Sequence, residues 1–261
     1  SRLIDAEAKG YRVSINSNGK VSINDVELPL NEPCLLGMTL NALLNDWDYA
    51  AGVSGHPWLR REGVAFKHVT FAVVETFNYR LYDFNIPHED GDWLIDIGAN
   101  VGDSAIWFAK RGFRVLAIEP VPSAFEEMLD NLMLNDVAGR VKAINAAYSL
   151  SHPAVKVNDY DCLESTITAS TSLTTGTVTV PGFNLRKLLE YTDWKARVLK
   201  VDCEGCEVEL VTDPMLPWFT DVLIEAPNRG VHKVLRGLGF RLVKVNKHPS
   251  NPDASVYHYA K

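Results

Sequence analysis

The chain has 261 residues, of which 46% are hydrophobic and 23% charged, and its formal net charge is -7. This composition is typical of a globular protein that buries a full α/β core. It disfavours a nucleic-acid partner, which usually calls for a basic patch, because the densest basic cluster is only Arg60 and Arg61 with Lys67. Membrane insertion is not expected either, since no stretch approaches the roughly 20 apolar residues that a spanning helix needs.

The sequence contains four cysteines, and only Cys203 and Cys206 are close together. A zinc site would need a second Cys or His pair with similar spacing, and none is present. The acidic neighbours Asp202 and Glu204 disfavour the thiolate form that redox chemistry requires. Residues 2–10 show no signal-peptide pattern. We therefore expect a reducing, cytoplasmic environment and no redox or metal role for this pair.

The first 90 residues are predicted to form a small N-terminal module or cap on the substrate side. Alternating apolar residues and a polar turn predict a β-hairpin over 11–30. Leucines at helical spacing predict a helix over 38–47, followed by a loop over 52–63. The alternation of Val69, Phe71 and Val73 predicts a strand.

From residue 91 the pattern changes to alternating strands and helices. This alternation predicts a doubly wound, Rossmann-like sheet, interrupted by an insertion of short extended segments over 155–181. The predicted strands are 93–97, 114–118, 141–146, 198–201, 222–224, 240–245 and 255–259, and the predicted helices are 104–110, 123–134, 185–191, 207–211 and 231–238.

The first predicted strand of this sheet leads into a glycine-rich turn and then a helix. Gly98 and Gly102 allow a tight turn that a ligand can approach closely. The free amides at the start of the helix favour a carboxylate, and Asp96 at the end of the strand is placed to accept from an ammonium group. An amino-acid moiety needs both features, and S-adenosylmethionine carries one.

Glu119 ends the second strand of the sheet, where an acid can accept hydrogen bonds from two ribose hydroxyls. An NAD enzyme is the rival interpretation. The turn does not have the Gly-x-Gly-x-x-Gly pattern of dinucleotide sites, however, and Asp96 and Asp103 would repel a pyrophosphate. In the alternative interpretation these residues bind no ligand: the glycines only shape a turn, and Glu119 is a solvent-exposed residue at the end of a strand.

Four motifs in order along the chain carry a family resemblance. The segment Asp96 to Ser104 resembles the cofactor motif of the FkbM-type methyltransferases, and so does Ala117 to Pro122 with the helix after it. The string Leu199 to Glu207 is similar to the Lys-x-Asp-x-Glu-Gly-x-Glu signature of the family, and Leu223 to Glu225 to its next strand. The cysteines within the signature and Ala226 after it depart from the usual pattern. Residues 1–85 resemble nothing that we can name.

The resemblance implies a seven-stranded methyltransferase sheet with an antiparallel last strand, in a domain over 91–261. It also implies transfer of a methyl group from S-adenosylmethionine to a hydroxyl of a sugar in a glycan or glycolipid, or of a small natural product. The residues that it assigns to the cofactor are Asp96, Gly98, Ala99, Asn100, Gly102, Ser104, Glu119, Pro120, Asn145 and Ala147.

Candidate catalytic residues follow the later strands. Asp202 or Glu204 is predicted to accept the proton of the acceptor hydroxyl or to orient it. These two acids could instead hold a divalent cation together with Glu225. His232 is a further candidate base, with a capping or surface role as the alternative. Lys200 is expected to pair with a carboxylate such as Asp202 or Glu225.

Other interpretations remain open. The chain could methylate a nitrogen of a small molecule or of RNA, or it could be a non-catalytic subunit that binds S-adenosylmethionine and supports a partner. Trp58, Tyr79 and Tyr82 are expected to be core residues, with a stacking wall for a sugar as the alternative. The oligomeric state is not predicted.

Overall fold

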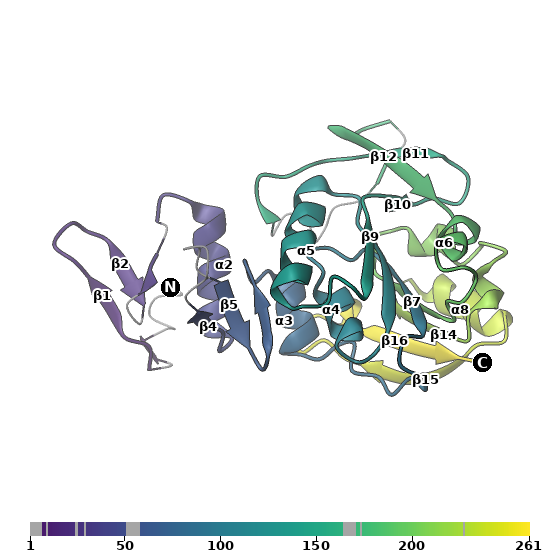
Figure 1. Ribbon diagram of the computed structural model, residues 1–261, viewed down its shortest axis with the longest axis horizontal. Helices are drawn as coiled ribbons and strands as arrows, with labels where there is room; N and C mark the ends of the chain where they lie inside the picture. Colours follow the sequence, from purple (N-terminus) through teal and green to yellow (C-terminus); the bar gives the residue numbers. More distant parts are fainter. Residues whose placement is uncertain are drawn as a thin grey trace.

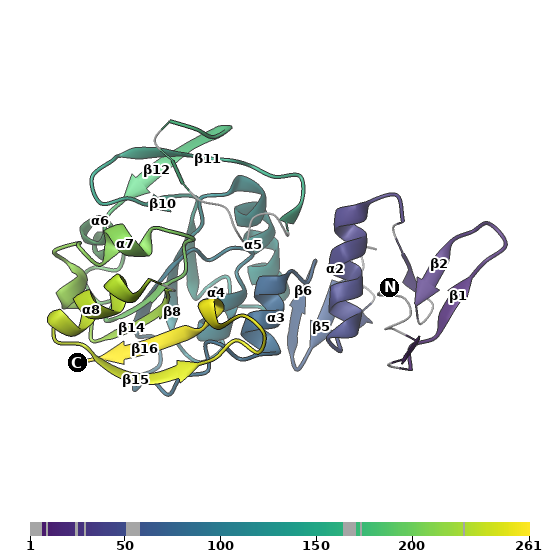
Figure 2. The same cartoon turned by 180° about the vertical axis from the view of Figure 1, so that it is seen from behind.

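The computed structural model describes residues 7–8, 10–23, 26–28, 30–50, 58–163, 171–172, 174–226 and 228–261. A large α/β body contains the central sheet, and a hairpin and a helix from the N-terminal region extend from one side of it (Figure 1). The view from behind shows the same two parts (Figure 2). Among the described helices, none combines the length and the apolarity needed to cross a lipid bilayer.

Seven strands form the central sheet, in the order β15-β16-β14-β13-β7-β8-β9. β16 pairs antiparallel with both of its neighbours, and the strands from β14 to β9 pair parallel. This confirms the predicted Rossmann-like sheet with an antiparallel last strand. The strand order reverses between β7 and β13, which is where ligands bind in open α/β sheets. The strands are β7 (Trp93–Ile97), β8 (Arg114–Ile118), β9 (Val141–Ile144), β13 (Val198–Val201), β14 (Asp221–Glu225), β15 (Arg241–Asn246) and β16 (Val256–Ala260).

Helices cover both faces of this sheet because its parallel strands are apolar on both sides. Leu94 and Val115 share one core with α3, α4 and α5, and Ile95 and Leu116 share a second core with α6, α7 and α8. Successive strand residues point to opposite faces, so one apolar run contributes to both cores. The helices are α2 (Pro33–Leu44), α3 (Phe71–Phe77), α4 (Asp103–Ala109), α5 (Pro122–Leu134), α6 (Leu185–Tyr191), α7 (Glu207–Leu210) and α8 (Arg229–Gly237).

The projecting lobe has a core of its own. β1 (Val13–Ile15), β2 (Val21–Ile23) and β3 (Val26–Glu27) form an antiparallel sheet, which confirms the predicted hairpin. The sheet packs on α2 through residues such as Ile23 and Leu43. The helix predicted over 38–47 begins earlier, at Pro33, because proline is well suited to the first turn of a helix.

Two predictions for the next segment were wrong. Part of the predicted loop 52–63 is a strand, β5 (Trp58–Arg61), which pairs with β4 (Asp48–Ala50) and β6 (Val64–Phe66); residues 51–57 lie outside the described part of the chain. The predicted strand over Val69 to Val73 is instead the start of α3. A short apolar run fits the side-chain period of a strand and that of a helix. The helix forms here because it buries Val73, Val74 and Phe77 in the core of the main body.

The insertion forms a small sheet of its own, in the order β10-β12-β11. β10 (Ala147–Tyr148), β11 (Ala154–Val157) and β12 (Val178–Phe183) confirm the extended segments predicted around Val155 and Val178. The segment predicted over 166–168 lies outside the described residues. This sheet packs against the start of α5 through Val121 and Ala124, so it lies beside the carboxyl edge of the main sheet.

All four cysteines are paired. Cys34, at the start of α2, is bonded to Cys162 in the insertion, and Cys203 is bonded to Cys206. These bonds are at odds with the reducing compartment expected from the sequence, because disulfides persist in oxidising surroundings. Nothing in the sequence indicated the first bond, because its cysteines, 128 residues apart, meet only in the folded chain.

Candidate active site

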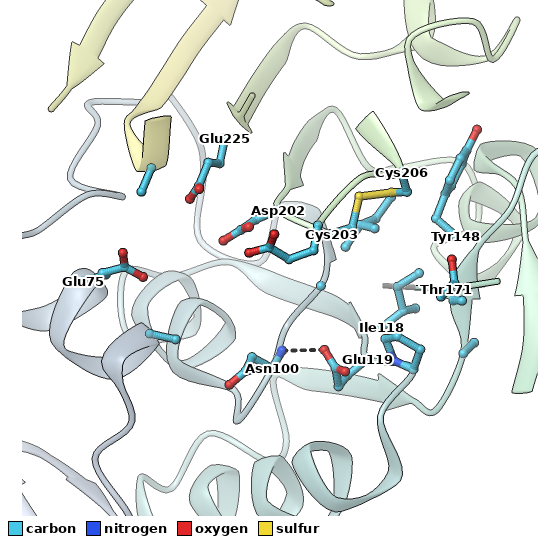
Figure 3. Close-up of a pocket in the computed structure, with 18 of the residues that line it drawn as sticks. Glu75, Asn100, Ile118, Glu119, Tyr148, Thr171, Asp202, Cys203, Cys206 and Glu225 are labelled. Atoms are coloured by element: carbon cyan, nitrogen blue, oxygen red, sulfur yellow. Dashed lines mark hydrogen bonds between the residues drawn. A yellow bond between two sulfur atoms is a disulfide. The ribbon is translucent and has the colours of Figure 1, made fainter. Parts of the chain in front are cut away.

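A cavity of about 270 Å³ opens at the carboxyl ends of β7, β8, β13 and β14. Its wall includes residues of the turns after β7, β8 and β13 and the last residue of β14, together with Phe71 and Glu75 of α3 and Thr171 of the insertion. The N-terminal region therefore supplies part of the site. Figure 3 shows the carboxylates of Glu75, Asp202 and Glu225 pointing toward one another on one side, with Glu119 on the other.

The glycine-rich turn after β7 is held tightly against its neighbours. Gly98 and Asn100 adopt left-handed conformations, with φ of 77° and 46°. A Cβ at Gly98 would lie 1.8 Å from the carbonyl oxygen of Asp202, so only glycine fits there. The Gly98 and Ala99 amides donate to the Ile118 carbonyl oxygen at 3.1 and 3.0 Å. The turn is thus fixed between β8 and β13 at the edge of the cavity.

Glu119 is buried in the cavity wall, with 4% of its surface exposed. Its Oε2 accepts a hydrogen bond from the Asn100 amide, and its Oε1 accepts one from the Val121 amide, both at 2.8 Å. Burial raises the pKa of Glu119 to about 7, and the two amides oppose this shift. Each carboxylate oxygen has capacity for a second hydrogen bond. The geometry is therefore that of a bidentate acceptor for two adjacent hydroxyls.

Behind the turn lies a buried ion pair. Lys200 Nζ is 3.0 Å from Asp96 Oδ1 and donates to the Gly98 carbonyl oxygen at 2.6 Å. The Ser104 hydroxyl donates to Asp96 Oδ2 at 2.7 Å. Burial alone would lower the pKa of Lys200, but the carboxylates of Asp96 and Asp202 outweigh it and raise this pKa. Lys200 therefore pairs mainly with Asp96, while Asp202 Oδ2 is 4.0 Å away.

Half of the residues predicted to hold a cofactor line the cavity and half support it from behind. Gly98, Asn100, Glu119, Pro120 and Ala147 are on the wall, whereas the others are not: Asp96, Ala99, Gly102, Ser104 and Asn145. The Asn145 side chain donates to the carbonyl oxygens of Glu119 and Pro120 at 2.8 and 3.1 Å. Asp96 is fully buried and paired with Lys200, so in this structure its carboxylate supports the turn from behind the wall.

Four carboxylates gather at the other side of the cavity, namely Glu75, Asp202, Glu204 and Glu225. Burial and the neighbouring charge of Asp202 raise the pKa of Glu225 well above its ordinary value. Partial burial of the carboxyl, with the charges of Asp202 and Glu207, raises the pKa of Glu204 to about 7, although the residue as a whole is exposed. Sequence reasoning missed Glu75, because α3 was predicted as a strand and its position at this edge gave no signal.

His232, the other predicted base, is not among the residues that line the cavity. Its Nδ1 is 2.9 Å from the Tyr259 hydroxyl and its Nε2 is 2.9 Å from the Ala226 carbonyl oxygen. Burial lowers the pKa of His232, so the neutral ring is favoured. Both ring nitrogens are engaged in structural contacts. This arrangement favours the capping alternative for His232.

The predicted divalent cation finds no support in the side chains that are described. Within that part of the chain, no group of three or more His, Cys, Asp or Glu is arranged to hold a metal ion. The wall does fit an adenosine-bearing ligand. Glu119 offers its two acceptor oxygens, and Ile118, Pro120 and Ala147 supply apolar surface beside it.

The seven-stranded sheet and the cavity at its switch point define a Rossmann-like methyltransferase domain. The chain belongs to the FkbM methyltransferase family, since the family model "Methyltransferase FkbM domain" matches residues 96–251. A curated relative, the methyltransferase sdnD of Sordaria araneosa, is 32% identical over 84 residues. That match spans 31% of this chain and only about a third (32%) of the relative.

Solved structures show more distant likeness. The METTL16 methyltransferase domain is 14% identical, with a TM-score of 0.49 over 100% of this chain and 91% of that one. Fibrillarin from Aeropyrum pernix, solved with natively bound S-adenosyl-L-methionine, is 13% identical, with a TM-score of 0.44 over 96% and 94%.

Proposed function

We propose that the protein transfers a methyl group from S-adenosylmethionine to a hydroxyl of a sugar or of another small molecule. One observation carries the proposal: a single cavity has the bidentate acceptor Glu119 on one side and four carboxylates on the other. The first side suits a ribose, and the second suits the activation of a hydroxyl. Both lie at the edge where this fold binds its ligands.

The donor side is formed by residues of β7 and β8 and the turns that follow them. The Glu119 carboxylate would accept a hydrogen bond from each of the two ribose hydroxyls, and Pro120 and Ala147 would flank the adenine. When bound, S-adenosylmethionine supplies an electrophilic methyl group on a sulfonium. The chain contributes alignment: Gly98 allows close approach, and Lys200 holds the turn in place from behind.

On the acceptor side, Glu204 is the proposed general base. A base works best when its pKa lies near the working pH, and the pKa of Glu204 is raised to about 7. Asp202 has a different role, because the Tyr82 hydroxyl donates to its Oδ2 at 2.8 Å and orients it. We propose that Glu204 accepts the hydrogen bond of the acceptor hydroxyl and takes its proton, and that Asp202 accepts a hydrogen bond from a neighbouring hydroxyl of a polyhydroxylated acceptor.

The chemical groups of the cavity wall indicate which class of acceptor the site favours. Carboxylates accept hydrogen bonds from hydroxyl groups and repel phosphates. Four of them in one cavity, in a chain with a net charge of -7, disfavour RNA as the acceptor. A polyhydroxylated acceptor such as a glycan sugar fits this wall better. A small amine is the alternative that the same charge allows.

The test has two stages. Calorimetry with S-adenosylhomocysteine measures donor binding without any acceptor, and an incubation with S-adenosylmethionine and a panel of sugars, small alcohols and amines, read by mass spectrometry, measures transfer. We expect donor binding and a gain of one methyl group on a hydroxyl. Methylated amines alone would overturn O-methylation. Donor binding with no product from any acceptor would favour a non-catalytic binding subunit.

In variants, Glu204→Gln should lower the rate of transfer by about 10²-fold or more while leaving donor affinity nearly unchanged. Glu190→Gln is a matched control, since Glu190 is an exposed acid on α6 that pairs with Lys187 outside the cavity. Equal rates in the two variants would remove Glu204 from the mechanism.

A further inference from the structure

The disulfide between Cys203 and Cys206 forms part of the cavity wall. Both cysteines line the cavity, as do Asp202 before the bond and Glu204 within it. Figure 3 shows the bond beside the Asp202 carboxylate. The cysteines are three positions apart, so the bond closes the turn between β13 and α7 into a small ring. Of the two proposed catalytic acids, Asp202 therefore directly precedes the covalent link and Glu204 lies within the ring.

The closed turn has a conformation that the chain disfavours by itself. Glu204 has a φ of 53° and Gly205 a φ of 122°, so two successive residues lie in the left-handed region. A glutamate reaches that region rarely, because its Cβ crowds the backbone there. Such a backbone persists only where surrounding contacts hold it. The disulfide spans both residues.

Glu207 also holds this turn, through two hydrogen bonds to its backbone. Its Oε1 accepts the Cys203 amide at 2.9 Å, and its Oε2 accepts the Gly205 amide at 2.8 Å. These bonds hold the amides on either side of Glu204, and the disulfide closes the same turn covalently. Glu207 and the disulfide therefore both hold the backbone at Glu204.

The turn also touches the glycine-rich turn after β7. A Cβ at Gly98 would meet the Asp202 carbonyl oxygen at 1.8 Å and the Cys203 Cα at 3.3 Å. The peptide that leads into the disulfide is thus packed on the donor side of the cavity. A shift of this peptide would change the spacing between the two sides.

From these contacts we infer that the Cys203–Cys206 disulfide positions Glu204 and Asp202, so that methyl transfer requires the oxidised pair. This inference rests on the proposed function. Reduction needs a dithiol such as dithiothreitol. Its thiolate attacks one sulfur and forms a mixed disulfide, and its second thiol then releases the protein. The S–S bond gains two electrons and two protons to give two cysteine thiols, and the reductant becomes a cyclic disulfide.

A second disulfide, Cys34–Cys162, would also respond to the reductant, so the test separates the two. Cys34→Ala/Cys162→Ala retains only the cavity disulfide, and Cys203→Ala/Cys206→Ala retains only the other. Alkylation and peptide mass spectrometry report which bond is open. Wild-type protein at graded dithiothreitol provides the same comparison if either double variant fails to fold, because the rate can be correlated with each bond separately.

The first readout needs no acceptor. The Glu204 carboxyl is titrated by ¹³C NMR, with its signal assigned by the loss of that signal in Glu204→Gln. The charged groups that face it are Asp202, Glu207 and Glu225. We expect a pKa of about 7 in the oxidised protein. On reduction of the cavity disulfide, this pKa should fall by about one unit or more toward the ordinary value of 4.5.

The second readout is methyl transfer to the acceptor found in the panel. We expect opening of Cys203–Cys206 to lower the rate roughly tenfold to a hundredfold, and oxidised glutathione to restore it. Opening of Cys34–Cys162 alone should not have this effect. An unchanged pKa of Glu204 after complete reduction of the cavity disulfide would overturn the inference. Absence of S-adenosylhomocysteine binding in both redox states would instead overturn the proposed function.

Discussion

The Tyr82 hydroxyl donates a hydrogen bond to Asp202 Oδ2 at 2.8 Å, across 120 positions of sequence. Tyr82 precedes the first strand of the central sheet, and Asp202 follows β13. Burial, together with the charge of Asp202, raises the pKa of Tyr82, so the phenol remains protonated and donates. A residue from the N-terminal region thereby orients an acid of the cavity.

Replacement of this donor is the first prediction. Tyr82→Phe should lower the rate of methyl transfer about threefold to tenfold, because Asp202 loses the bond that orients it, and should destabilise the fold by about 1 kcal/mol. Tyr259→Phe is the matched control, since Tyr259 is equally buried but contacts His232 outside the cavity. We expect a similar loss of stability in the control with an unchanged rate. Steady-state kinetics and urea unfolding measure both, and a parallel loss of rate in the control would contradict a specific role for Tyr82.

Gly98→Ala should abolish donor binding. Its Cβ would lie 1.8 Å from the Asp202 carbonyl oxygen, at a residue whose φ is 77°. The clash and the strained backbone together should cost about 2 to 5 kcal/mol of unfolding free energy. At Gly139 a Cβ meets nothing within 4 Å, so Gly139→Ala should change stability by less than about 0.5 kcal/mol. Donor affinity of the folded fraction, measured by calorimetry, is the second readout, and wild-type affinity in Gly98→Ala would refute the predicted packing.

Glu119→Gln should weaken the binding of S-adenosylhomocysteine by about 10- to 100-fold, the equivalent of about 1.4 to 2.8 kcal/mol. Both oxygens of Glu119 accept a backbone amide, so the NH₂ of glutamine would face another donor. Glu127→Gln is the control, because Glu127 is as buried as Glu119 but pairs with His68 away from the cavity. Equal affinities in the two variants would show that Glu119 does not hold the donor.

The pH dependence follows from the raised pKa of Glu119, about 7 in the folded chain against an ordinary value of 4.5. Between these two values the folded state binds the proton that the unfolded state has released, so this group's contribution to stability falls as pH rises, by up to about 3 kcal/mol. The affinity for the methyl donor should instead increase as pH rises, because only the ionised carboxylate accepts hydrogen bonds from both ribose hydroxyls. We expect S-adenosylhomocysteine to bind more tightly as pH rises through 7 and then to level off.

Calorimetry across pH 5 to 9 tests this expectation, with ~10-fold tighter binding at the high end. In Glu119→Gln the dependence should largely disappear. A profile that is equally steep in this variant would assign the titration to another group, such as Glu204.

Local pattern was sufficient for the central sheet and for the place of Gly98 and Glu119 in the cavity wall. The largely apolar runs at 94–97, 115–118 and 198–201 are typical of buried parallel strands, both of whose faces are covered. Gly98 and Glu119 could be assigned from sequence because each ends a strand, and strand ends of a parallel sheet meet at one edge. These relationships depend on neighbours along the chain and on a regular topology.

Long-range packing determined the rest. The run at 69–77 fits a strand and a helix equally well until Val73, Val74 and Phe77 meet the main core, and only this helix carries Glu75 to the cavity. Asp96 ends one strand and pairs with Lys200 of another, a contact that only the folded sheet brings about. Cys34 and Cys162 are brought together only by the folded chain. Periodicity contains no information about such contacts, because they depend on which surfaces are buried together.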